Sequence, residues 1–287
     1  MIAWCDKHVR KLCRAPWSLR LAGICIALVI PASAYLVGAV AIEQAGSLSS
    51  WLGQAVSVGL AFTTLAGRDL LDHVRAVSHE LVRGNLPGAR HAVTMIVGRD
   101  TETLPEPEII RATVETIAES AADGIIAPLL YLTLGGAPLA LAYKAVNTLD
   151  SMIGHRDARY EHLGWASARL DDLANWIPAR LTAGLIAIAA GLATGQGRRV
   201  SESWGICQRD GHKHPSPNSG RPEAAMAGAL GVQLGGANYY DGQPQARPQL
   251  GDGTRTLVLN DIDAASRLLL ISYGLGLLLA MTALWIA

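Results

Sequence analysis

The hydrophobic pattern of the chain is dominated by two long apolar windows. Residues 19–42 contain no Asp, Glu, Lys or Arg after Arg20, and residues 266–287 carry only Arg267 near their start. A helix that crosses a hydrocarbon core about 30 Å thick needs roughly 20 apolar residues, so both windows predict membrane spans. A third window, residues 51–67, is uncharged but shorter, and we predict a span there too.

Two further apolar windows are interrupted. Prolines and glycines break residues 124–143, and Arg180 shortens the apolar part of residues 177–194. Irregular backbone at membrane depth is tolerated where it lines a protein cavity, so we predict embedded or re-entrant segments. The predicted fold is an all-α, polytopic integral membrane protein with helical cytoplasmic segments, organised as one membrane-embedded domain over residues 1–287. Three polar blocks separate the apolar windows: residues 68–123, 144–176 and 195–265.

The distribution of basic residues predicts the topology. The first span is preceded by Lys7, Arg10, Lys11, Arg14 and Arg20, whereas residues 43–50 contain no Lys or Arg. The positive-inside rule then places the N-terminus in the cytoplasm, and the second span returns the chain there. If both interrupted segments crossed, residues 147–183 would face outward. If neither crosses, all three polar blocks face the cytoplasm, which is the arrangement that we prefer.

The first and third polar blocks contain local signals. Apolar residues recur at helical spacing over residues 70–81, and Gly84 with Asn85 ends that helix. Pro87 can open the next helix, which we expect near residues 91–97. Residues 241–254 are rich in Gly, Pro and Gln, which predicts a flexible loop.

Composition narrows the class of partner. Half of the 287 residues are hydrophobic and 17% are charged, and the mean hydropathy of +0.25 is high for a soluble protein. The 24 basic and 24 acidic residues balance, so net charge gives no information about a nucleic-acid partner. We expect a lipid bilayer and no nucleic acid as partner. The four cysteines lack CxxC spacing and predict reduced thiols. Cys207, His212 and His214 form a poor zinc ligand set.

Residues 147–183 place five carboxylates, four arginines and two histidines between apolar segments. Ionisable groups near bilayer depth cost about 2.5–3.5 kcal/mol each, so such a cluster persists where the groups pair, line a wet cavity or take part in chemistry. We predict the centre of an active site there, with structural ion pairs as the alternative. The candidate residues in this segment are Asn147, Asp150, Arg156, Asp157, Arg169, Asp171 and Asp172.

Spacing limits which of these residues can act together. Asp150 and Asp157 share a face only if a helix runs unbroken through Gly154. Asp171 and Asp172 point in different directions on a helix, so at most one of them faces the same site as Asn175.

A second carboxylate group is predicted on one helix face. Glu115, Glu119 and Asp123 are spaced four residues apart, and like charges at that spacing repel one another. A Mg²⁺ ion would explain them, because it takes carboxylate oxygens together with water and substrate phosphates. The alternative is a solvated polar face paired with arginines, including Arg111.

Two segments are candidate anion sites. Arg99 follows Gly98 and can clamp a phosphate, although a helix end with a surface ion pair explains it equally well. Residues 214–220 read HPSPNSG, a rigid polar loop before a helix start, where His214 and Asn218 can form an anion cradle. A common turn is the alternative.

Five strings, in order, resemble the CobD/CbiB family of cobalamin biosynthesis over residues 67–236. They are VGRDT, ETIAESAADGIIAPLLY, KAVNTLDSMIGHRDARY, GWASARLDDLANWIPARLTA and HPSPNSGRPEAAMAGALGVQLGG. The resemblance implies an adenosylcobinamide-phosphate synthase. Such an enzyme couples (R)-1-amino-2-propanol O-2-phosphate, or threonine phosphate, to a propionate carboxylate of adenosylcobyric acid with ATP and Mg²⁺. It also implies an inner membrane enzyme whose active site faces the cytoplasm, with other corrin-pathway enzymes or a second copy as expected partners.

Residue roles follow from that chemistry as hypotheses. Metal ligands would be Glu119, Asp123 and Asp157; ligands of ATP or the amino phosphate would be Arg99, Asn147, Arg156, Arg169 and Asn218; catalytic groups would be Asp150, Asp171, Asp172 and His214. Either Asp171 or Asp172 would take the proton of the amine. The sequence has no Walker A pattern, so nucleotide binding would be unconventional.

Two departures from the family pattern stand out. The chain begins at MIAWCDKHVRKL, where the family usually has an earlier apolar segment, so the N-terminus is expected to be shortened. The usual Glu-Asn pair appears as Glu119-Ser120. A non-enzymatic membrane regulator of the AmpE type is the main alternative, and a transporter is the next. A CDP-alcohol phosphotransferase is excluded because its aspartate motif is missing.

Overall fold

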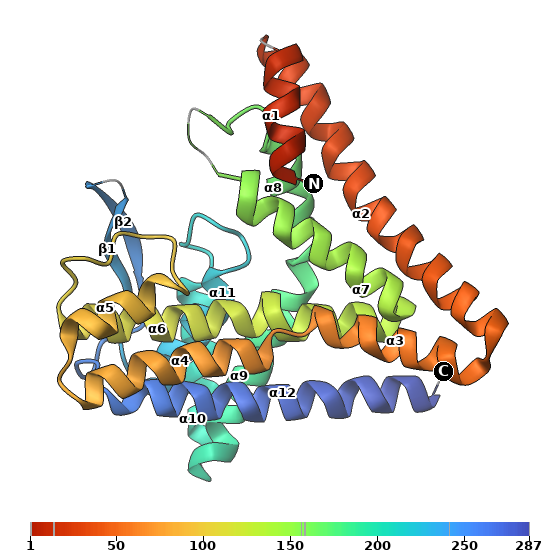
Figure 1. Ribbon diagram of the computed structural model, residues 1–287. Helices are drawn as coiled ribbons and strands as arrows, with labels where there is room; N and C mark the ends of the chain where they lie inside the picture. The colour runs from red at the N-terminus through yellow and green to blue at the C-terminus, as the bar shows by residue number, and fades with distance from the viewer. Residues whose placement is uncertain (1, 14, 156, 158, 241, 287) are drawn as a thin grey trace. The chain divides into compact units, whose positions relative to one another are not determined.

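The computed structural model describes residues 2–13, 15–155, 157, 159–240 and 242–286 (Figure 1). The chain divides into two compact units: Met1–Leu65 with Ala127–Asn175, and Ala66–Ile126 with Trp176–Ala287. Below, they are called unit 1 and unit 2. Whether they act as one membrane-embedded domain stays a prediction.

Unit 1 is built from helices. They are α1 (Ile2–Leu12), α2 (Pro16–Leu48), α3 (Ser50–Thr64), α7 (Ala127–Ile153) and α8 (Trp165–Ala174). A small core joins α2 and α7 and includes Ile26, Leu149 and Leu163. The backbone at Gly164 lies close to the end of α7, because an added Cβ would be 1.7 Å from the Ile153 carbonyl oxygen. Only glycine permits that approach.

Helix α7 is broken where the sequence predicted an interruption. Gly135 and Gly136 have non-helical backbone angles, with φ of +68° at Gly136, and Pro138 follows. The interruption expected in residues 124–143 is therefore confirmed. Whether this segment crosses or only enters the bilayer stays a prediction.

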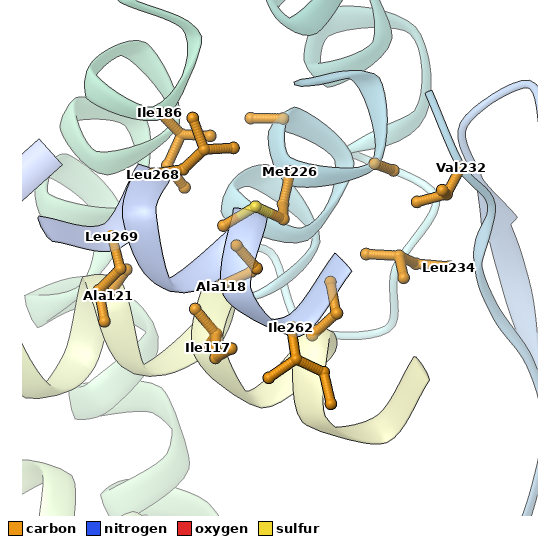
Figure 2. Close-up of a cluster of buried hydrophobic side chains, with 14 of the residues drawn as sticks. Ile117, Ala118, Ala121, Ile186, Met226, Val232, Leu234, Ile262, Leu268 and Leu269 are labelled. Carbon is orange, nitrogen blue, oxygen red and sulfur yellow. The ribbon is translucent and has the colours of Figure 1, made fainter. Parts of the chain in front are cut away.

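Unit 2 has a larger core. Its elements are α4 (Gly67–Val82), α5 (Leu86–Thr94), α6 (Glu106–Ser120), the π-helix η1 (Ala121–Ile126), α9 (Trp176–Thr194), α10 (Gly197–Asp210), α11 (Gly220–Leu230), β1 (Leu234–Tyr240), β2 (Gln243–Leu250) and α12 (Asn260–Ile286). Figure 2 shows side chains from α6, α11 and α12 meeting in the core, among them Ile117, Met226 and Leu269. These three side chains are almost fully buried. This core fixes α6 and α11, which carry Glu115, Glu119 and Glu223.

The first polar block folds largely as the sequence predicts. Leu70, Val74, Val77 and Leu81 line the buried face of α4. The helix stops before Gly84, whose φ is +68°. The next helix begins earlier than expected, at Leu86, because the Asn85 side chain accepts the Gly88 N–H at 3.2 Å and caps it.

The flexible loop predicted over residues 241–254 is wrong for most of that segment. Gln243–Leu250 is β2, paired antiparallel with β1 in a two-stranded hairpin (Figure 1). The outer edge of β1 is bonded to other parts of unit 2: Glu115 accepts the Gly235 N–H at 2.8 Å, and Arg111 donates to the Ala237 carbonyl at 3.1 Å. Side-chain contacts from α6 thus fix strands that lack an alternating apolar pattern.

Among the residues that the structure describes, four helical runs are long and apolar enough to cross a membrane: Pro16–Leu48, Glu106–Ile153 (which includes the kink in α7), Trp176–Thr194 and Asn260–Ile286. Large apolar side chains on α2 and α12 are exposed, as lipid-facing surfaces require. The predicted all-α membrane fold is confirmed, with the hairpin as a small addition. The third predicted span, residues 51–67, falls mainly in α3 (Ser50–Thr64), whose 15 residues extend about 22 Å, and α3 is not among these four. The number of true crossings stays a prediction.

Candidate active-site clusters

A buried polar network joins α6 to the hairpin in unit 2. Arg99 Nη1 donates to Glu115 Oε2 at 3.0 Å, and Arg111 Nη1 donates to Glu115 Oε1 at 2.8 Å. Both guanidinium groups also donate to the Asn238 side chain. The arginine side chains are each 6% exposed and that of Glu115 is 14% exposed. Arginine pairing, the alternative to a metal, therefore describes Glu115.

Arg99 retains unused hydrogen-bonding capacity. Its Nε and Nη2 atoms are buried and make no hydrogen bond to the residues that the structure describes. Burial also lowers the pKa of Arg99 from its ordinary value, although the neighbouring Glu115 partly opposes this effect. An arginine fork binds phosphate or carboxylate through two parallel bonds, so these atoms fit an anion.

His214 lies in the turn between α10 and α11 and is almost fully buried. The distance from Nη1 of Arg247, on β2, to His214 Nε2 is 2.8 Å. Burial, and then the charge of Arg247, lower the pKa of His214 to about 4. The ring is therefore neutral near pH 7, and it can accept or position a hydrogen bond but is a poor proton donor.

A buried carboxyl group lies beside His214. Glu223, in the first turn of α11, has its Oε1 4.0 Å from His214 Nε2, and its side chain is 7% exposed. Burial raises the pKa of Glu223 well above its usual range, and the charges of Glu115 and Glu119 raise it further, whereas Arg247 and Arg99 oppose the change. We call Arg99, Glu115, Glu119, His214, Glu223 and Arg247 the hairpin cluster.

The predicted metal ligands of unit 2 lie where α6 passes into η1. Glu119 is exposed and accepts the Ser219 hydroxyl at 3.0 Å, while Asp123 is half-buried one turn later, inside the π-helix. Across the described ranges, no three His, Cys, Asp or Glu residues are arranged to hold a metal ion. Two carboxylates nevertheless fit Mg²⁺, which keeps waters and phosphates in its shell. A cation would also reduce the electrostatic repulsion between the carboxylates of Glu119 and Asp123.

Asn218 of the predicted anion cradle is buried in the same turn. The Asn218 and Ser219 backbone N–H groups point to Ser216 Oγ, at 3.3 and 3.2 Å. The turn is thus held by its own serine, as the turn interpretation anticipated. His214 and Asn218 still lie immediately before the N-terminus of α11.

Unit 1 holds a second polar group, which we call the aspartate cluster: Asn147, Asp150, Asp171, Asp172 and Asn175. Burial, and then the charge of Asp150, raise the pKa of Asp171 to about 7, while the polar side chains of Asn175 and Asn147 lower it. Asn175 is fixed in turn by Tyr143, whose hydroxyl donates to it at 2.8 Å. Asp171, rather than Asp172, therefore faces Asn175.

The remaining predicted residues of the charged segment are more exposed. Arg169 Nη1 lies 3.4 Å from Asp172 Oδ2 and its side chain is 62% exposed. Helix α7 ends at Ile153, so the unbroken helix needed to align Asp150 with Asp157 is not formed. Asp157 instead accepts the backbone N–H groups of Arg159 and Tyr160, both at 2.8 Å. Arg156 lies outside the described residues.

Several participants were not singled out by sequence reasoning. Asn238 and Arg247 lie on β1 and β2 of the hairpin, which the sequence did not predict, and Glu223 lies in the first turn of α11. Tyr143 looked like part of an apolar window. The sequence offered one signal for these residues, the glutamate Glu223 among the small residues of α11, and this signal does not show which residues lie beside it.

Comparison with known proteins decides the family. The family model described as CobD/Cbib protein matches residues 1–269. The chain belongs to the CobD/CbiB family. It is 54% identical over 243 residues to "Cobalamin biosynthesis protein CobD" of Geobacter metallireducens, covering 85% of this chain and 74% of the relative.

Two other relatives are similar over almost the whole chain. A CobD protein of Klebsiella pneumoniae is 45% identical over 280 residues, covering 97% of this chain and 86% of the relative. "Cobalamin biosynthesis protein CbiB" of Salmonella typhimurium is 43% identical over 284 residues, covering 99% and 88%. No solved structure shows a significant match to the chain. Membership in this family supports a role in cobalamin biosynthesis.

Proposed function

We propose that this CobD/CbiB protein is an amide-forming ligase of cobalamin biosynthesis. It would couple (R)-1-amino-2-propanol O-2-phosphate, or threonine phosphate, to a propionate carboxylate of adenosylcobyric acid with consumption of ATP. The product with the first amine would be adenosylcobinamide phosphate. The family relationship supports the pathway, and the two polar clusters supply the kinds of group that the reaction needs.

The raised pKa of the buried Asp171 is the observation on which the proposal mainly rests. Amide formation from a protonated amine needs a group that accepts a proton near neutral pH. Burial and Asp150 raise the pKa of Asp171 to about 7, so it can both accept and release a proton in that range. The side chains of Asn147 and Asn175 partly oppose this increase in the pKa of Asp171.

The proposed reaction consists of two balanced steps, a phosphoryl transfer and then an acyl transfer to the amine. ATP gives its terminal phosphoryl group to the propionate, forming an acyl phosphate and ADP, because an oxide is a poor leaving group. The amine, having lost a proton to Asp171, attacks the acyl carbon, and phosphate leaves as the amide forms. One ammonium, one carboxylate and one ATP thus give one amide, ADP, phosphate and a released proton.

Arginines and carboxylates would bind the charged reactants. Arg99, with its unused donors, and Asn218 fit a phosphate in unit 2, and Arg169, with Arg156, is a candidate in the charged segment of the chain. Glu119 and Asp123 would hold Mg²⁺. When bound, the ion neutralises phosphate charge during transfer. Neutral His214 would orient a bound group rather than donate a proton.

An activity assay tests the proposal. Membranes containing the chain, adenosylcobyric acid, the amino phosphate and Mg-ATP are expected to form the product. Asp171→Asn should lower the rate about 10²–10⁴-fold, the usual contribution of a general base. Asp263→Asn, an exposed site at the start of α12, is the matched control and should leave the rate unchanged.

The opposite results are equally informative. Full activity in Asp171→Asn, Asp150→Asn and Glu119→Gln would exclude the proposed catalytic groups. No product from folded wild-type protein would favour a non-enzymatic membrane regulator of the AmpE type.

A further inference from the structure

The outer face of α1 in unit 1 carries two lysines and a tryptophan. Lys7 and Lys11 are one helical turn apart, and Trp4 lies one turn before Lys7, so the three side chains share a face. All three are exposed, and Trp4 is 63% exposed. Within the part of the chain that the structure describes, neither lysine forms a hydrogen bond or an ion pair. This face therefore presents positive charge beside an exposed aromatic ring.

Asp6, the only carboxylate of α1, is turned inward. Its buried side chain accepts bonds from Arg10 Nε at 2.6 Å and from Arg159 Nη2 at 2.8 Å. Arg10 also donates to the Arg159 carbonyl at 2.7 Å. These contacts join α1 to the segment that follows α7, and they fix the rotation of α1 about its own axis. The negative charge of α1 is thus paired inside unit 1, while Lys7 and Lys11 point outward.

The inner face of α1 packs beside the first turns of a predicted span. Ile2 and Val9, opposite the lysines, pack against the small core that includes Ile26 of α2, and α1 lies alongside α2 (Figure 1). Trp17, just before the apolar window of residues 19–42, is 69% exposed. Tryptophan is enriched where a membrane meets water. The outer face of α1 therefore lies at the level expected for the bilayer surface.

We infer that the outer face of α1, formed by Trp4, Lys7 and Lys11, binds anionic phospholipid headgroups. We call it the lysine face. Basic side chains on a helix at the membrane surface are attracted to anionic lipids, and an aromatic ring anchors such a helix at the depth of the headgroups. This inference goes beyond the proposed reaction and does not depend on it.

Charge and position together favour an anionic lipid over other occupants. A zwitterionic headgroup brings a cation with every phosphate, so it does not balance two lysines. A second copy of the chain would place the same positive face against this one. Free phosphate would pair with the lysines but leave Trp4 in water. An anionic bilayer surface supplies both the negative charge and an apolar layer for the ring.

Lipid-selective fluorescence quenching tests the inference. In a full-length chain with its native cysteines replaced by serine, Ala3→Cys places a thiol on the exposed side of α1 for a fluorescent label. The protein is reconstituted in nanodiscs of equal parts phosphatidylglycerol and phosphatidylcholine, with bromine, a contact quencher, on one lipid or the other. The headgroup composition then stays constant. Brominated phosphatidylglycerol should quench the label about twofold more strongly than brominated phosphatidylcholine.

Matched charge changes show whether the lysines cause the preference. Lys7→Gln combined with Lys11→Gln should make the two lipids quench equally. Arg68→Gln combined with Arg83→Gln removes the same charge from exposed positions of unit 2 and should keep the preference. In wild type, raising the salt to about 1 M should also reduce the preference, because the screening length falls to about 3 Å.

Three results would overturn the inference. They are equal quenching by the two lipids in wild type, a preference that survives in the folded double lysine variant, and no quenching by either lipid, which would place the lysine face away from the bilayer. Circular dichroism during heating reports whether each variant is folded. If the double lysine variant does not fold, the salt dependence of wild type decides. No measurement needs ATP or a corrinoid, so failure of the ligase proposal leaves this test intact.

Discussion

At the scale of single residues, environment rather than residue type separates the carboxylates. Asp171 is held partly neutral by burial and by Asp150, whereas Asp210 is held ionised by Arg209 and Lys213. Glu115 forms ion pairs with two arginines, Arg99 and Arg111. A carboxylate thus serves as a candidate base at Asp171, as a structural ion pair at Asp210 and as a support for the hairpin at Glu115.

The raised pKa of Asp171 predicts a pH profile. The base must be ionised, so kcat should rise as the pH increases through about 7. The folded protein binds this proton more tightly than the unfolded chain does, so the Asp171 contribution to stability is greatest at acidic pH and is lost as the pH rises through about 7. Asp171→Asn should therefore flatten this limb of the profile and raise Tm at pH 8. A profile that falls between pH 6 and 8 would contradict the role.

Asp210 predicts the opposite linkage. Its carboxylate accepts bonds from Arg209, Lys213 and the Gly251 N–H, and these contacts hold its pKa well below the usual range. Its contribution is present above the unfolded pKa and is lost as the pH falls through the folded one. Asp210→Asn should lower the stability by about 1–3 kcal/mol, measured by thermal melting at pH 7, and should reduce the loss of Tm on acidification. An unchanged Tm would show that the buried contacts contribute little.

At the scale of elements, close helix packing depends on particular glycines. An added Cβ at Gly228 of α11 would lie 2.8 Å from Ser203 Cα of α10, whereas Gly205 of α10 faces open space. Ser203 also donates to the Ala225 carbonyl at 2.7 Å across this contact. The two glycines form a matched pair for testing backbone contact against helix propensity.

Gly228→Ala should destabilise the protein by about 1–3 kcal/mol, because one helix must move away from the other. Gly205→Ala should stabilise it by about 0.5–1 kcal/mol, because alanine is the better helix former and meets no neighbour. Thermal or denaturant unfolding in detergent measures both changes. Equal effects of the same sign would show that helix α10 and helix α11 do not pack this closely.

The hairpin is predicted to depend on Glu115. Glu115→Gln removes the carboxylate that faces two buried arginines and accepts the Gly235 N–H. Breaking such a buried pair costs about 3–5 kcal/mol, so Tm should fall and limited proteolysis should cleave within residues 234–250 sooner. Glu202→Gln, which removes a half-buried glutamate of α10 paired with Arg198 and Arg199, is the control. Wild-type proteolysis of Glu115→Gln would mean that other contacts hold the hairpin.

At the scale of the whole molecule, apolar length and topology are separate questions. Helices Glu106–Ile153 and Trp176–Thr194 are long and apolar enough to cross, yet the first contains the kink at Gly135 and Gly136. We retain the prediction that neither crosses and that all polar blocks face the cytoplasm.

Cysteine labelling tests that topology. In a chain with its native cysteines replaced by serine, Glu102→Cys, Glu161→Cys and Asp252→Cys place one exposed thiol in each polar block. A membrane-impermeant thiol reagent should label all three in inverted vesicles and none in right-side-out vesicles. Labelling of Glu161→Cys alone from outside would show that both interrupted segments cross and would place the aspartate cluster outside.

The sequence by itself determined the membrane character, the main helices and the polar segments that hold the candidate chemistry. Those properties are local, because apolar length, helical periodicity and a costly charge cluster can be read along the chain. Only the tertiary structure decided that Glu115 is paired with arginines, that Asp171 faces Asn175, and that Glu223 and Arg247 lie beside His214. Such pairings join segments far apart in the chain, and burial then sets the charge of each group. The hairpin was not predicted for the same reason: its strands lack an alternating apolar pattern, and the edge of β1 is held by side chains of α6.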